Sequence, residues 1–246
     1  MGKKIIRVIA VVLIPVVCLY LLTLLLTPKY VNDIPEGSMI AEYYKSEKNN
    51  DVLILGDCEV YENISTVKMW EEYGITSYIR GSSEQLIWQS YYLLEDTLKH
   101  ETPKVVVLSM LAMSEADAKS EAYNRMTLDG MRWSKSKWNS IKESMTEKET
   151  MGSYIFPLLR YHSRWSELSS DDIKYMFNKP KVTSNGYLMQ VGVRPVTTVP
   201  KVSPLANYTF SDRNYEYLDK IKDLCNEKGI KLVLIKAPSI FPHWYD

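Results

Sequence analysis

Three short runs of this chain are apolar at every position, and they constrain the fold more than any other feature. They are Val52–Leu55, residues 105–108 in "KVVVLSM" and residues 232–235 in "IKLVLIKAP". Continuous apolar runs of this length are typical of strands that are buried on both faces, as in parallel sheets. The segment "ITSYIRG", which ends at Gly81, predicts a fourth short strand. We therefore expect a parallel β-sheet.

Amphipathic segments lie between these strands. Residues 67–73, 82–100 and 212–228 have apolar positions at helical spacing, and Ser82 or Ser83 is expected to cap the second helix. Strands that alternate with helices predict an α/β fold with three layers, a flavodoxin-like parallel sheet covered by helices on both faces. The domain is expected to span residues 51–246. Residues 112–202 interrupt the alternation and predict a large insertion, which we expect to form a cap near the strand ends.

The N-terminus predicts a membrane anchor. An uncharged, almost wholly apolar run from Val8 to Leu26 follows Lys3, Lys4 and Arg7. Roughly 20 such residues are enough for a helix to cross a bilayer, and flanking cations stay on the cytoplasmic side. Residues 1–27 are therefore expected to be a cytoplasmic tip and a single transmembrane helix in the cell membrane. Residues 28–50 would be a stalk, and the domain would be extracytoplasmic.

Composition and motif content argue against nucleic-acid binding and against a metal or cofactor site, and they single out one cysteine. The chain of 246 residues carries 30 Lys+Arg and 30 Asp+Glu, a balance that gives no support to nucleic-acid binding. Neither metal-site spacing of Cys and His nor a glycine-rich phosphate loop is found, so no cofactor or metal is expected. Of the three cysteines, Cys18 lies in the apolar run and Cys225 on the apolar face of a helix, which leaves Cys58 as the cysteine of interest.

Cys58 follows directly on the first strand, in "VLILGDC". Ligands of open α/β sheets bind beyond the carboxyl ends of the strands, where Gly56, Asp57 and Cys58 are expected, with Gly81 at the end of the next strand. A nucleophile on such a turn can stabilise an oxyanion through its own backbone N–H and that of Gly81. Gly56 and Asp57 would then support the turn.

These residues resemble the first two sequence blocks of the SGNH/GDSL hydrolase superfamily, an apolar strand followed by Gly-Asp-Ser and a glycine that ends the next strand. The chain looks most like the membrane-anchored SGNH-like proteins of clostridia, in which a segment like Trp70–Gly74 follows the first block. The resemblance implies an esterase or acyltransferase that acts on cell-envelope glycan, with a membrane-bound acyltransferase as a partner. It also places Arg160, His162 and Arg164 in a cap segment, as substrate contacts.

Two departures from the family pattern put catalysis in doubt. The family serine is replaced by Cys58, and the C-terminal Asp-x-x-His block is absent, with His243 and Asp246 in the reverse order. The expected function is therefore an SGNH-like esterase or acyltransferase that is impaired or is a C-terminally short fragment. The alternative is a non-catalytic module of the same fold that binds a glycan or a membrane partner.

Overall fold

The computed structural model describes residues 2–30, 34–192 and 209–237; within the first range, the side chains of residues 2–6 and 8–10 lie outside the description. The strands are β1 (Val52–Gly56), β2 (Ser77–Gly81), β3 (Val105–Ser109) and β4 (Lys231–Ile235). The helices before β3 are α1 (Gly2–Leu26), α2 (Glu36–Glu42), α3 (Cys58–Asn63), α4 (Thr66–Tyr73) and α5 (Ile87–Thr97). Those after it are α6 (Glu121–Leu128), α7 (Lys135–Ser144), α8 (Met151–Ile155), α9 (Leu158–Tyr161), α10 (Ser170–Lys174) and α11 (Asp212–Glu227). Single 3-10 turns occur at η1 (Tyr43–Lys45), η2 (Met110–Ser114) and η3 (Arg164–Glu167).

The four strands form one parallel sheet in the order β2-β1-β3-β4. This confirms the prediction of an α/β fold with a parallel sheet, and the order is the one that flavodoxin-like sheets begin with. Because the strands are parallel, their carboxyl ends meet at one edge. Gly56 and Gly81 are register partners at that edge, and Ser109 pairs there with Ile235.

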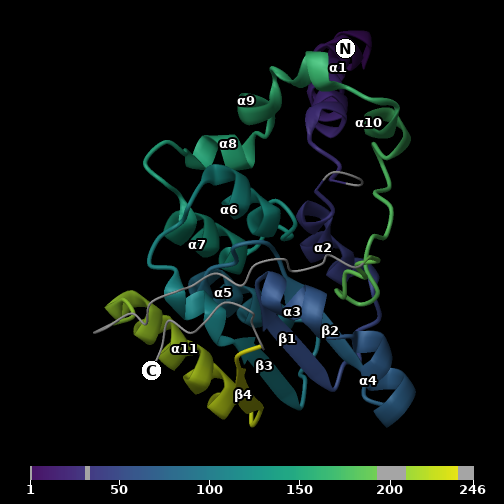
Figure 1. Cartoon of the computed structure of the whole chain (residues 1–246). Helices are drawn as coiled ribbons and strands as arrows, with labels where there is room; N and C mark the ends of the chain where they lie inside the picture. Colours follow the sequence, from purple (N-terminus) through teal and green to yellow (C-terminus); the bar gives the residue numbers. More distant parts are fainter. Residues whose placement is uncertain (1, 31–33, 193–208, 238–246) are drawn as a thin grey trace.

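Strands β1 and β2 are buried on both faces and β3 is mostly so, as their apolar runs predict. The prediction is wrong for β4, the edge strand among the described residues, where Val233 and Leu234 are 44% and 47% exposed because fewer described residues cover them. Leu53 and Leu55 of β1 point into a large core formed with α5, α7 and α11. Val52 and Ile54 point the other way, into a smaller core that includes Val60 of α3. Helices α3 and α4 contact β2 on that second side (Figure 1).

Some element boundaries differ from the predicted ones. Helix α5 begins at Ile87, and neither Ser82 nor Ser83 caps it. The reason is that Ser82 Oγ is buried in hydrogen bonds with Gln85 and Thr127, which hold residues 82–85 in a turn. Helix α3 was not predicted at all. It begins where the Asp57 carboxylate accepts a hydrogen bond from the backbone N–H of Glu59.

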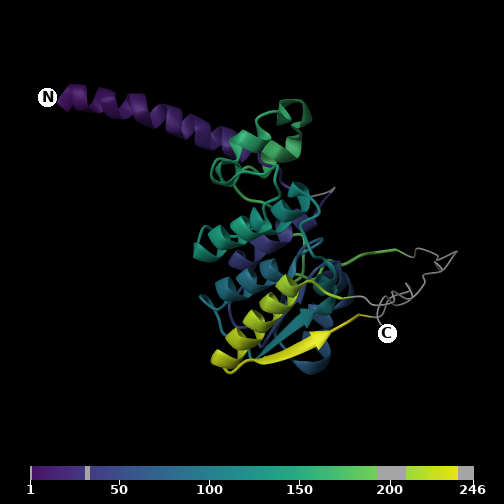
Figure 2. The ribbon, with the colours of Figure 1, turned by 90° about the vertical axis from the view of Figure 1, so that its left-hand side faces the viewer.

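The helices of the insertion lie beside α5 and the end of α1. Helix α7 packs on α5, and α8 to α10 continue from there toward the end of α1 (Figures 1 and 2). The chain then returns to the edge of β2, where Ile79 N–H donates to Asn185 O at 2.9 Å, and to α3, where Leu188 N–H donates to Tyr61 O at 2.9 Å. Described residues of the insertion therefore support α1, α5 and the edge of β2.

Helix α1 projects from one side of the domain, while β4 runs toward the other side (Figure 2). The last turn of α1 is bound to the domain, because Arg164 donates to the carbonyl of Leu26 at 2.5 Å. Lys29 Nζ caps the helix by donating to the carbonyl of Leu24 at 2.6 Å and also pairs with Asp172 at 3.8 Å. Within the part of the chain whose residues are described, no helix combines the length and the apolar character needed to cross a membrane.

Candidate functional site

The carboxyl edge of the sheet begins with a tight turn at Gly56. This residue has φ +153°, and a Cβ there would lie 2.7 Å from Cβ of Ser109 on β3. Only glycine fits both the backbone conformation and the space. The turn therefore brings the start of α3 directly against the end of β3.

Asp57 caps α3 rather than facing a ligand. Its Oδ1 accepts from the Glu59 N–H at 3.0 Å, and the side chain is buried. Burial raises the pKa of Asp57 to about 6, and the nearby Glu59 carboxylate acts in the same direction. The structure thus places this residue at the turn, where its carboxyl group stabilises the first turn of a helix.

Cys58 is the first residue of α3, and its half-buried side chain packs against the smaller core. Burial raises the pKa of its thiol to about 12. The carboxylates of Asp57, Glu62 and Glu84 act in the same direction. A thiol in such surroundings is neutral at physiological pH, whereas the thiolate is the nucleophilic form.

Two of the three histidines fall in the described ranges, and neither is placed to activate Cys58. His100 packs against the ring of Tyr44 at 5.9 Å, near the amino ends of the strands. The exposed His162 has its Nδ1 3.2 Å from the carbonyl oxygens of Leu158 and Leu159 on α9. His243 and Asp246 lie outside the described residues.

Gly81 lies beside the turn, as predicted for the end of the second strand. A Cβ on Gly81 would approach the carbonyl oxygen of Gly56 to 2.9 Å and Val60 Cγ2 to 3.2 Å. Close packing of β2 against β1 and α3 therefore explains why residue 81 is a glycine. This explanation does not depend on the predicted binding of an oxyanion by the Gly81 N–H.

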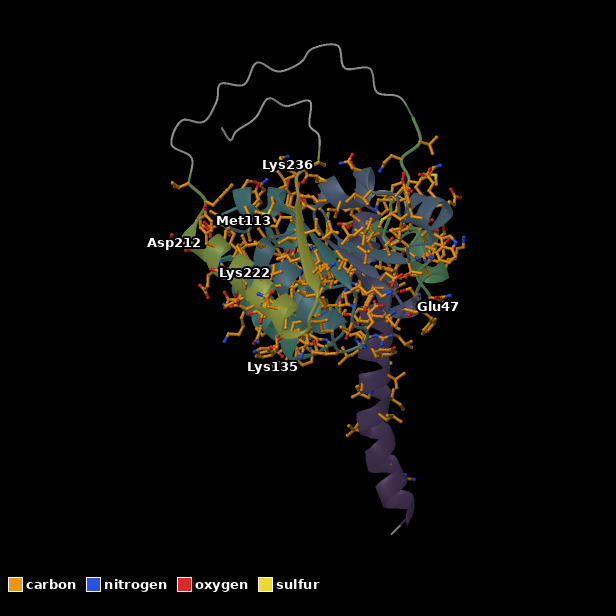
Figure 3. All side chains as sticks on the ribbon, turned by 90° about the horizontal axis from the view of Figure 1, so that it is seen from below. Glu47, Met113, Lys135, Asp212, Lys222 and Lys236 are labelled. Carbon is orange, nitrogen blue, oxygen red and sulfur yellow. The ribbon has the colours of Figure 1, made fainter. Side chains whose placement is uncertain are left out.

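The most organised polar group at this edge is Glu59, which sequence reasoning missed. Its side chain is 6% exposed. Ser109 Oγ donates to Glu59 Oε2 at 2.5 Å, and Oε1 accepts from Lys236 Nζ at 3.0 Å and from Ala237 N–H at 2.9 Å. One carboxylate thus joins the ends of β1, β3 and β4. Figure 3 labels Lys236 on the side of the domain opposite to α1.

A signal for this cluster was present in the sequence. Ser109 and Lys236 follow apolar runs in the same way as Asp57 does, so parallel pairing predicts that all three lie at one edge. The sequence could not indicate that the side chain of Glu59, two residues after Asp57, turns toward these strand ends. That depends on the capping geometry of α3.

Arg160, His162 and Arg164 lie far from this edge, beside the end of α1. Arg160 pairs with Glu121 at 3.1 Å. Arg164 pairs with Asp172 at 3.4 Å in addition to its bond to α1. Both arginines line a hollow of about 620 Å³ there. The structure therefore does not bring them together with Cys58.

Among the described residues, no group of His, Cys, Asp and Glu side chains is arranged to hold a metal ion. No family model, curated protein or solved structure matches this chain.

Proposed function

We propose that this protein is a membrane-anchored, extracytoplasmic module of SGNH-like, flavodoxin-like architecture that binds cell-envelope glycan or a membrane partner without acyl chemistry. The observation that carries the proposal is the setting of Cys58. Its thiol is half-buried beside three carboxylates, which favour the unreactive neutral form. The neighbouring Glu59 is fully engaged in holding strand ends together.

The sequence and exposure of α1 support the anchor. Side chains from Val11 to Leu21 are mostly apolar, and the large ones are exposed rather than packed on the domain. Lys3, Lys4 and Arg7 at the start of this helix favour a cytoplasmic N-terminus by the positive-inside rule. The helix then ends on the domain, which would lie outside the cell.

The carboxyl edge is the candidate binding surface, because ligands of open α/β sheets bind there. Lys236, a half-buried cation, closes this edge next to Glu59. The resemblance of the Gly56–Cys58 and Gly81 blocks to the SGNH superfamily gives the ligand class, cell-envelope glycan. Binding of soluble peptidoglycan and teichoic acid fragments to the full chain in detergent micelles, compared with Lys236→Glu, tests this surface.

The second candidate is an esterase or acyltransferase that uses Cys58. The observation that favours it is the register of Gly56 with Gly81, which sets Cys58 beside the glycine that ends the next strand. In this chemistry the sulfur would attack an ester carbonyl to form a thioester and release the alcohol. A base would have to take the thiol proton, and the thioester would then pass to water or to a glycan hydroxyl.

Turnover of p-nitrophenyl acetate by the full chain in micelles separates the two candidates. The binding module is expected to give background rates in the wild type, Cys58→Ala and Cys58→Ser alike. A wild-type rate that Cys58→Ala abolishes would overturn it in favour of the thiol enzyme. A gain in Cys58→Ser would overturn it too, because it would mark a scaffold that is competent for serine catalysis.

Membrane fractionation tests the anchor separately. The chain is expected to stay in the membrane pellet through alkaline carbonate extraction, and its domain is expected to be cut by protease added to spheroplasts. Release of the chain by carbonate would refute the anchor without bearing on Cys58.

A further inference from the structure

Large apolar side chains are exposed on the segment from α8 to the residues after α10. Phe156, Leu159, Trp165, Ile173 and Phe177 are each 56–76% exposed. We refer to these five residues as the apolar collar. Single exposed apolar residues are ordinary, but several on one segment indicate a surface that another apolar phase covers.

The collar surrounds the end of α1. Helices α9 and α10 both contact α1 and lie on either side of it in Figure 1. Lys29, three residues past the end of α1, pairs with Asp172 of α10 at 3.8 Å. Phe177 lines a hollow of about 500 Å³ together with Leu24 of α1. The collar is therefore at the level of the last turns of α1.

Helix α1 leaves the domain at this same level. Its large side chains are exposed up to Leu21, whereas those from Leu22 to Leu26 are partly or wholly covered. A helix that is apolar all round and projects from a domain needs an apolar surrounding, and the collar continues that apolar surface onto the domain.

Exposed cations lie beside the collar residues, and the exposed carboxylate of Glu167 is paired with Arg164 at 3.2 Å. Arg160 and Lys174 are exposed cations on α9 and α10, next to Leu159 and Ile173 in sequence. Aromatic rings at the headgroup level, with Arg and Lys beside them, are typical of proteins that rest on a bilayer surface.

We propose that the apolar collar rests on the phospholipid bilayer, with its side chains in the interfacial layer around the point where α1 enters. This inference rests on the proposed membrane anchor. The collar and the capped end of α1 would together fix how the domain sits on the membrane. The five collar residues are thus a lipid-binding surface in addition to the anchor itself.

Bromolipid quenching of tryptophan fluorescence tests the collar in the full chain, reconstituted in phosphatidylcholine liposomes with or without dibromo-phosphatidylcholine. The sequence has 6 Trp, none of them in residues 8–26. Trp133 and Trp138 are also exposed, so both are replaced by Phe in every protein compared. In that background, Trp165→Phe is expected to remove most of the bromolipid-dependent quenching. Trp70→Phe is the matched control, because Trp70 is as exposed as Trp165 but lies on α4, and it is expected to retain the quenching.

Flotation of the same liposomes distinguishes a failure of the membrane anchor from a failure of the apolar collar. Protein that floats but shows equal quenching in both variants would overturn the collar and leave the anchor intact. A second copy covering the collar would give this result, together with a larger particle in micelles. Protein that fails to float would overturn the anchor and the collar together.

Discussion

Glu59 is the residue on which the carboxyl edge depends, since it accepts hydrogen bonds from the ends of two other strands. Glu59→Ala would leave the Lys236 ammonium and Ser109 hydroxyl without this partner, so we expect the free energy of unfolding to fall by about 3 kcal/mol. Urea unfolding in micelles measures this. Glu72→Ala is the control, because its pair with Lys68 is exposed and worth at most about 0.5 kcal/mol. Equal losses in the two variants would contradict a special role for Glu59.

Asp57 gives the stability a pH dependence of known sign. Its pKa is raised to about 6 in the fold, from 3.8. The folded state therefore holds the proton more tightly, and the stability from this group is present below about pH 4 and lost as the pH rises to about 6. Asp57→Asn can still cap α3, so it should equal the wild type near pH 4 and exceed it by about 2 kcal/mol at pH 7. Unfolding curves across this range measure the difference, and a constant difference would refute the raised pKa.

Cys58 is expected to react slowly with iodoacetamide at neutral pH, and faster as the pH rises toward its pKa of about 12. A Cys18→Ser, Cys225→Ser background isolates its rate. Glu84→Gln removes one of the carboxylates that raise this pKa, so it should accelerate alkylation a few-fold. Glu72→Gln on α4 is the matched control. A neutral-pH rate as fast as that of free cysteine would contradict the environment described for the thiol.

At the residue scale, the sequence was sufficient to place Gly56, Asp57, Cys58 and Gly81 at one edge, because strand ends in a parallel sheet coincide. It was not sufficient for the electrostatics of the site. Glu62 and Glu84 act on Cys58 from α3 and from the turn after β2, and that proximity exists only in the folded chain. Nor did the family pattern indicate that the Arg160–Arg164 segment would lie beside α1.

At the element scale, apolar continuity predicted three of the four strands to within a few residues, and the segment "ITSYIRG" predicted the fourth. Helix starts were predicted less well, because a serine that could cap a helix can form hydrogen bonds with other side chains instead. Ser82 is an example: its hydroxyl bonds Gln85 and Thr127 instead of starting α5. The α3 helix was missed for a related reason, since its six residues are too few to show a helical period.

Two glycines test the packing of elements. Gly74 ends α4 with φ +65°, and the space around its Cβ position is open. Gly74→Ala should therefore lower the free energy of unfolding by only about 1 kcal/mol, the strain of a left-handed backbone in alanine. Gly186 has φ +84°, and a Cβ there would lie 2.0 Å from Ile79 O of β2. Gly186→Ala should therefore cost several times more, because it detaches residues 183–188 from the sheet. Thermal unfolding compares the two, and equal losses would contradict the close contact.

At the scale of the whole molecule, the sequence predicted the parts but not their arrangement. The insertion was expected to cap the strand ends, yet its described helices lie along α5 and reach α1 instead (Figures 1 and 2). Contacts between α6 and α2, and between α9 and α1, join segments far apart in the chain. Such contacts depend on buried surfaces that a local pattern does not identify.

The proposed anchor and the direction of α1 together predict which side of the domain faces the bilayer. Figure 3 shows Lys135 on the side from which α1 projects, and Asp212 further from it. Both residues are exposed. In a background without the native cysteines, a fluorophore on Lys135→Cys should be quenched more strongly by nitroxide-labelled headgroups than one on Asp212→Cys. The capped end of α1 holds this orientation, so Lys29→Met, which removes the ammonium bound to the Leu24 carbonyl, should reduce the difference, whereas Lys68→Met should not. Equal quenching at both positions in the wild type would mean that the domain does not keep one face toward the membrane.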